Sequence, residues 1–117
     1  MTDLVAKAEE LIRLTGQLAS IMEADVALLR GRRPAELASN ENDRTMTMLL
    51  YTKAATELKG SNVLKQLPGP VRTRLRAASE RLQAAVKEQN RLLTRFRHVT
   101  EGMIKAVADV EIGRAHV

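Results

Sequence analysis

The chain has 117 residues, enough for one domain with a modest hydrophobic core. Aromatic residues make up only 2% of it, which argues against a β-sandwich, because sheets favour aromatic and β-branched side chains. It has no cysteine, which excludes disulfides and thiolate metal sites. Its uncharged runs fall far short of the ~20 residues that cross a bilayer, and its N-terminus is unlike a signal peptide. We therefore expect a soluble, cytoplasmic protein without a membrane span.

The first predicted helix spans residues 3–30 and repeats its apolar side chains in heptads. One set of positions falls seven residues apart and a second set fills the intervals, as in Leu4, Leu11, Leu18 and Asp25, then Ala8, Leu14, Ile21 and Leu28. Gly31 predicts the end of this helix, because glycine is common just beyond a helix C-terminus.

The second predicted helix, residues 34–59, is the weakest of the three. Pro34 suits its first position. Its apolar face is interrupted by Asn40 and Arg44, so we expect close packing only in the second half, at Met48, Tyr51, Ala55 and Leu58. Residues 59–70 are rich in turn formers and predict a loop. We expect the apolar side chains of this loop to pack onto the end of the bundle, namely Val63, Leu64 and Leu67.

The third predicted helix, residues 71–110, has the most regular pattern. Its seam positions alternate by three and four residues, and all but Gln89 are apolar: Val71, Leu75, Ala78, Leu82, Ala85, Gln89, Leu92, Phe96, Val99, Met103, Ala106 and Val110. This 3.5-residue period indicates coiled-coil packing with left-handed supercoiling. At 1.5 Å per residue the helix is roughly 60 Å long.

These elements predict an all-α fold, a long antiparallel up-down-up helical bundle with coiled-coil packing, in a single domain over residues 1–110. Because the third helix is the longest, part of its apolar seam should extend past the other two and require a partner. That partner is a second copy, another protein or a further C-terminal segment. Residues 111–117, EIGRAHV, break the pattern and resemble a translated sequencing adapter, so we interpret them as a non-native tail, the alternative being a frayed natural C-terminus.

Catalytic and metal-binding patterns are missing from the sequence. There is no HExxH, no phosphate-binding glycine loop, and no serine with a plausible base, and His98 is interpreted as a solvated or boundary residue. We therefore expect no enzyme activity and no cofactor. Residues 71–110 carry nine basic and four acidic side chains. We interpret this basic face as solvated, with an acidic protein as an alternative partner and nucleic acid as the least favoured, because no aromatic residues are available for base stacking.

Three stretches, taken in order, carry a resemblance to a known family: IMEADVALLRGR (21–32), PAELASNENDRTMTMLLY (34–51) and KEQNRLL (87–93). They resemble the FlgN-type flagellar export chaperones. The positions that match the family pattern are Glu23, Leu28, Gly31, Tyr51, Asn90, Leu92 and Leu93, and Arg44 stands where the family has a lysine.

The resemblance implies a cytoplasmic, non-enzymatic chaperone that holds the helical ends of flagellar hook-associated (hook–filament junction) subunits before type III export. It also implies that much of the substrate binding lies in the C-terminal part of the chaperone, which we expect to be truncated in this chain. Anchors spaced for an amphipathic helix lie on the third helix, and the expected partner-binding residues are Asn90, Leu92, Leu93, Phe96, Val99, Met103 and Ala106. The same residues also fit a core or homodimer seam. A self-associating coiled-coil scaffold and a basic nucleic-acid-binding protein remain the alternative functions.

Gln89 interrupts the seam and has two interpretations. A buried amide fixes the alignment of packed helices at a cost in stability, and Gln89 would then pair with Asn40 or Asn42 on the second helix. The family pattern instead singles out the neighbouring Asn90, which with Leu93 would border the substrate groove and bond to a partner's backbone.

Overall fold

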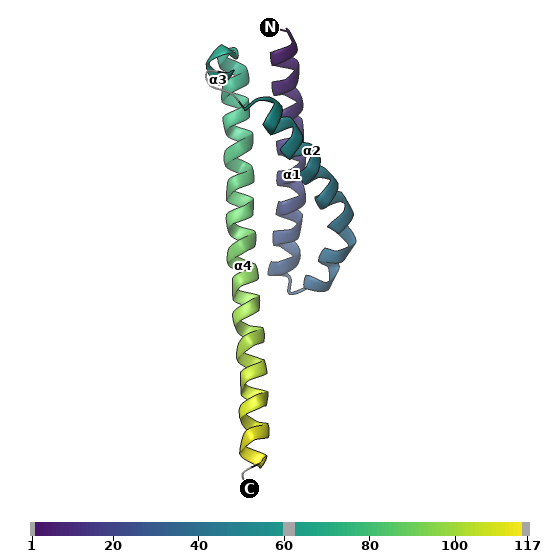
Figure 1. Ribbon diagram of the computed structural model, residues 1–117, viewed down its shortest axis with the longest axis vertical. Helices are drawn as coiled ribbons and strands as arrows, with labels where there is room; N and C mark the ends of the chain where they lie inside the picture. The colour runs from purple at the N-terminus through teal and green to yellow at the C-terminus, as the bar shows by residue number, and fades with distance from the viewer. Residues whose placement is uncertain (1, 60–62, 116–117) are drawn as a thin grey trace.

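The computed structural model describes residues 2–59 and 63–115, and the side chains of residues 3–59, 63–98, 102 and 105. All elements in these ranges are helices, so the all-α prediction is confirmed (Figure 1). In chain order they are α1 (Thr2–Arg30), the 3-10 helix η1 (Pro34–Asn40), α2 (Glu41–Glu57), α3 (Val63–Gln66) and α4 (Gly69–Ala115). The molecule is a rod of 77 × 28 × 20 Å.

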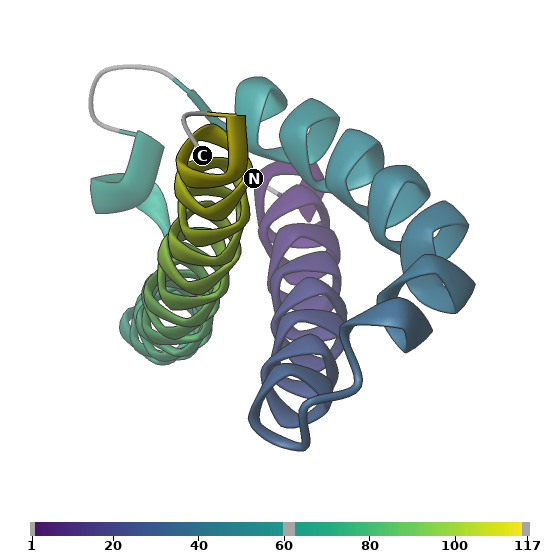
Figure 2. The ribbon, with the colours of Figure 1, turned by 90° about the horizontal axis from the view of Figure 1, so that it is seen from below.

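Helices α1 and α4 lie side by side and run in the same direction (Figures 1 and 2). Three ion pairs join them in matching order along both helices, Glu9–Arg74, Glu23–Arg81 and Arg30–Glu88. Partners that advance together along two helices require a parallel pair. Because α2 runs back between them in the chain, it points the opposite way to both helices.

The core consists of three apolar clusters arranged along the interface between α1 and α4. The first holds Ala8, Leu11, Leu58, Leu67, Val71 and Leu75, the second Leu18, Ala19, Met22, Leu82 and Ala85, and the third Val26, Leu29 and Leu92. The positions that α4 contributes are members of the predicted seam, separated by three, four or seven residues. The seam read from the sequence is therefore the surface that packs on α1.

Helix α2 packs mainly on α1 and is inclined to it (Figure 2). The single helix predicted over residues 34–59 is divided, because residues 34–40 form the 3-10 helix η1. Pro34 opens η1, and no residue of η1 is buried. The one large apolar residue of η1, Leu37, is only half-buried against the third cluster, and with so little burial to hold a longer α-helix the segment adopts the tighter turn. The first half of the predicted helix was expected to pack poorly, and its residues are exposed or only half-buried.

The predicted loop over residues 59–70 contains α3 and the start of α4. Leu67 is buried and Val63 half-buried, as expected, but Leu64 is 55% exposed and does not pack onto the bundle. Pro70 lies in the first turn of α4, where a backbone N–H has no partner within the helix, so the absence of this group in proline costs nothing.

Helix α4 runs well past the end of α1, as Figure 1 shows. Among the described side chains of α4, Leu92 is the last that belongs to the core, and it packs on Leu29 near the end of α1. The backbone continues as one helix through Ala115, so the helix does not end where residue 111 was expected to start a non-native tail. The eighteen residues from 98 to 115 correspond to about 27 Å of helix. No other described element lies beside this segment.

Candidate partner-binding site at the end of helix α1

A polar cluster of Asp25, Arg44 and Gln89 joins α1, α2 and α4 inside the bundle. The carboxylate of Asp25 is fully buried. Its Oδ2 accepts a hydrogen bond of 2.7 Å from Arg44 Nε and one of 3.1 Å from Gln89 Nε2. Arg44 Nη2 also donates to the carbonyl of Leu37, at 3.2 Å. The bond with Asp25 raises the pKa of Arg44, so this guanidinium remains charged.

The predicted pairing of Gln89 with Asn40 or Asn42 is wrong. Gln89 bonds to Asp25 on α1, because α1 rather than α2 lies along the seam of α4. Asp25 is itself a heptad position of α1, so the polar residues of the two seams meet at one level. The interpretation of Gln89 as a buried amide that aligns helices fits this contact.

Helix α1 ends in a backbone motif that places an arginine in a strained position. The N–H of Arg32 donates to the carbonyl of Leu29 at 3.2 Å, and that of Arg33 to Leu28 at 2.9 Å, the pattern of a Schellman motif. Its left-handed residue is Arg32, with φ 58°. A side chain in this region is unfavourable for any residue but glycine. Gly31, which was expected to stop the helix, directly follows the last residue of α1, Arg30. It lies where a Cβ would come within 3.3 Å of the Ala27 carbonyl oxygen.

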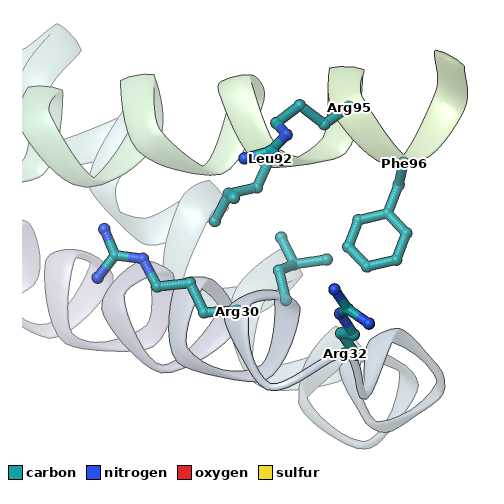
Figure 3. Close-up of a pocket in the computed structure, with 6 residues that line it drawn as sticks. Arg30, Arg32, Leu92, Arg95 and Phe96 are labelled. Atoms are coloured by element: carbon teal, nitrogen blue, oxygen red, sulfur yellow. The ribbon is translucent and has the colours of Figure 1, made fainter. Parts of the chain in front are cut away.

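A cavity of about 510 Å³ opens at this point, between the end of α1 and the side of α4 (Figure 3). Its apolar surface comes from Leu29, Leu92 and Phe96, and its charged surface from arginines at positions 30, 32 and 95. In Figure 3 Leu92 and Phe96 extend from α4 toward α1, and Arg32 lies opposite the Phe96 ring. We call this site the end cavity. It combines an apolar floor with cationic walls.

The three arginines of the end cavity differ in their ion pairs. Arg30 pairs with Glu88 at 3.0 Å, and Arg91 binds the same carboxylate. Hydrogen bonds from Arg91 and then Arg30 lower the pKa of Glu88 to about 2, so this carboxylate is ionised at neutral pH. Within the described part of the chain, Arg32 and Arg95 have no carboxylate within salt-bridge distance.

The structure brings together only some of the residues expected to bind a partner. Leu92 and Phe96 line the end cavity. Asn90 and Leu93 are exposed and do not line it, and a helical period places Asn90 nearly opposite Leu92 on α4. The remaining predicted side chains lie outside those that the structure describes, although their backbone continues α4: Val99, Met103 and Ala106.

The other positions of the family pattern have structural contacts of their own. Glu23 pairs with Arg81, whose hydrogen bond lowers the pKa of the carboxyl group. Leu28 is half-buried, and its carbonyl accepts the hydrogen bond from the Arg33 N–H that closes the end of α1. Tyr51 is half-buried against the first two apolar clusters. These residues, with Arg44 and Gln89, hold the bundle together and do not enter the end cavity.

An exposed apolar surface on α2 was not anticipated from the sequence. Met46, Leu49 and Leu50 are 59%, 62% and 45% exposed, and their spacing places them on one side of α2. We call this surface the outer face of α2. The sequence feature that could have revealed this surface is the apolar run TMTMLLY. It places large side chains on both sides of one helix, whereas a surface helix is apolar on one side only.

Part of the positive charge of α4 is offset by ion pairs with glutamates. Arg74, Arg81 and Arg91 each pair with a glutamate. Among the described residues, no group of acidic or histidine side chains has the arrangement of a metal site. None of the described helices is both long and apolar enough to cross a membrane.

Comparisons with protein-family models, curated proteins and solved structures found no match to the chain.

Proposed function

We propose that this protein is a cytoplasmic, non-enzymatic chaperone of the FlgN type, which binds an amphipathic helix of a hook-associated subunit before flagellar type III export. One observation carries the proposal. The apolar seam of α4 is covered by α1 as far as Leu92, which packs on Leu29, and then continues through the half-buried Phe96 into a cavity that no described side chain fills. An unoccupied seam of this kind accepts an apolar helix face.

In this proposal the fold is an up-down-up bundle in which α1 and α4 pack as a coiled coil. The parallel order of their ion pairs and the three-four spacing of the buried residues on α4 support it. A substrate helix then takes the place that α1 leaves empty beyond Arg30. It lies on α4 as a continuation of α1.

The energetics require contact beyond the end cavity. A buried Leu or Phe side chain contributes about 1.5–3 kcal/mol. Leu92 is already buried against Leu29, so Phe96 is the only one of the two that can gain this burial, whereas micromolar binding needs about 8 kcal/mol after the cost of association is met. The substrate must therefore also contact the following turns of α4, where the seam carries Val99, Met103 and Ala106.

Binding of a purified hook–filament junction subunit to the full chain, measured by calorimetry, tests the proposal. Phe96→Ala should weaken binding at least tenfold, because Phe96 is an apolar wall of the end cavity and only half-buried. Leu64→Ala is the matched control, since Leu64 is exposed on α3, which lies at the end of the rod where α1 and α4 begin and far from the end cavity (Figure 1). Equal binding by wild type and Phe96→Ala would contradict the proposed site.

A self-associating scaffold is the second candidate, favoured by the exposed outer face of α2 together with the uncovered part of α4. Sedimentation over a range of concentrations distinguishes the two. Under the scaffold hypothesis the protein forms a stable dimer that excludes the subunit. Under the chaperone hypothesis the subunit binds in a one-to-one complex.

A further inference from the structure

The contacts that stabilise the fold do not explain all of the positive charge in the end cavity. Arginines near a helix C-terminus are favourable because they offset the negative end of the helix dipole, which accounts for Arg30 and in part for Arg32. It does not account for Arg95, which lies well inside α4. Nor do the arginine side chains cap α1, because backbone N–H groups already bind the last carbonyls.

The strain at Arg32 also points to a role outside the fold. Glycine would occupy this left-handed position more favourably, and the Schellman motif requires only the backbone N–H of the residue there. Strained non-glycine residues in folded proteins occur preferentially at functional sites. Arg32 faces the end cavity next to Phe96 (Figure 3). Within the described part of the chain, the Arg32 side chain has no hydrogen bond or ion pair that would offset the cost of this backbone position.

We propose that the end cavity recognises an acidic turn of the partner helix, whose carboxylates bind Arg32 and Arg95 while its apolar side chains pack on Leu92 and Phe96. This inference rests on the proposed function and specifies the partner's chemistry: an amphipathic helix with Asp or Glu in the turn next to α1. Guanidinium groups bind carboxylates through two parallel hydrogen bonds. The apolar floor limits access of water and so strengthens the pair.

Charge complementarity selects this occupant over a second copy of the chain. A copy laid on α4 in the direction of α1 would present a helix start whose first turn holds a single acid, Asp3. A nucleic acid would satisfy the arginines but not the aliphatic and aromatic floor between them. An acidic amphipathic helix satisfies both parts of the site.

Two synthetic peptides test the inference by fluorescence anisotropy. Each is a 20-residue amphipathic helix with Leu at heptad positions, an acetylated N-terminus and an amidated C-terminus. One has three Glu residues in its first turn and the other has three Gln residues. The wild-type chain should bind the Glu peptide at least tenfold more tightly than the Gln peptide at 50 mM salt, and this preference should shrink at 500 mM.

The double variant Arg32→Gln/Arg95→Gln should bind both peptides with equal affinity. Its matched control is Arg72→Gln/Arg76→Gln, which removes the same charge from exposed positions near the start of α4 and should keep the preference. Lysines at positions 32 and 95 should recover only part of it, because an ammonium group cannot form the paired bonds. Arg32→Gly gives a further check: it should lose part of the preference while the melting temperature rises.

The outcomes separate this inference from the proposed function. Equal binding of the two peptides by wild type, abolished by Phe96→Ala, would leave the groove in place and overturn the arginine recognition. A loss of preference in the Arg72/Arg76 control as large as in the double variant would show general charge attraction and would also overturn it. Absence of binding by either peptide would overturn both.

Discussion

Gln89 of α4 donates a hydrogen bond of 3.1 Å to the buried Asp25 of α1, between the second and third apolar clusters of the interface. Each residue is the polar member of its helix's heptad seam at this level. A shift of either helix by one heptad would place Asp25 against Leu82 or Phe96, and a buried polar group without a partner costs about 1–3 kcal/mol. The pair therefore fixes the register of α1 against α4, and with it the position at which α1 ends and the end cavity opens.

Arg44→Leu should be the most destabilising single change in the polar cluster. It leaves the fully buried Asp25 carboxylate, whose Oδ1 already has no hydrogen-bond partner, without its counter-ion. Removing one member of a buried pair costs about 3–5 kcal/mol, and the partial exposure of Arg44 places this case near 3 kcal/mol. Urea unfolding followed by circular dichroism measures the loss.

The matched control for Arg44→Leu is the double variant Asp25→Leu/Arg44→Leu. It removes the charge together with its counter-ion and should be more stable than the single variant. A double variant less stable than Arg44→Leu would show that the cluster does more than neutralise a buried charge.

Arg32→Gly should raise the free energy of unfolding by about 1 kcal/mol, since it relieves the left-handed strain at φ 58°. Gly31→Ala should have the opposite effect, because its Cβ would lie 3.3 Å from the Ala27 carbonyl oxygen. Thermal unfolding of the two variants beside wild type measures both effects. A fall in stability for Arg32→Gly would mean that the arginine side chain makes a fold contact that offsets the strain.

Acid should destabilise the protein in a defined range of pH. Because the pKa of Glu88 is lowered to about 2 in the folded state, its ion pairs contribute stability above the ordinary glutamate pKa, near 4.5, and that contribution is lost as the pH falls from 4.5 to 2. Glu23, whose pKa is also lowered, acts in the same direction. The urea midpoint of wild type should therefore fall over this range.

Glu88→Gln should fall less steeply than wild type between pH 4.5 and 2, since it has already lost these ion pairs at neutral pH. The control is Glu80→Gln, an exposed residue of α4 that has no ion pair in the described part of the chain. Its acid dependence should match that of wild type. Identical curves for all three proteins would contradict the assignment of acid sensitivity to Glu88.

Leucines on the two sides of the bundle should respond differently to truncation. Leu18 is 1% exposed in the second apolar cluster, so Leu18→Ala should cost about 2–5 kcal/mol. Leu49 is 62% exposed on the outer face of α2, so Leu49→Ala should change stability by less than about 0.5 kcal/mol. Urea unfolding measures both. A large cost for Leu49→Ala at dilute concentration would indicate that the outer face is covered in solution.

The sequence predicted the first and last helices and the described part of the α4 seam, because a heptad pattern is local and the buried positions follow from it. It did not predict which helix covers the seam. Asp25 was recognised as a heptad position of α1, and Gln89 as the interruption in α4. Pairing the two required the knowledge that the first and last helices, and not neighbours in the chain, form the main interface.

The end cavity depended on features that a periodic pattern does not encode. Leu92 and Phe96 were expected to bind a partner because the seam continues past the shorter helices. Arg32 belongs to the turn after α1, and Arg95 lies on the side of α4. They line one cavity because the Schellman motif turns the chain at the end of α1. The outer face of α2 was missed because its apolar residues were read as a single stripe.

The parallel pairing of α1 with α4 has a consequence for how the protein is made. The residues that pack together along the two helices are separated by about 63 positions, as Ala8 and Val71 are. At 5–20 residues per second, a ribosome takes roughly 3–13 s to deliver the second after the first. During this interval the newly made α1 has only α2 to cover it, and the apolar side chains that pack on α4 await a segment not yet synthesised. Early folding of this chain therefore depends on the α1–α2 contact, and nascent chains on neighbouring ribosomes are competitors for the place of α4.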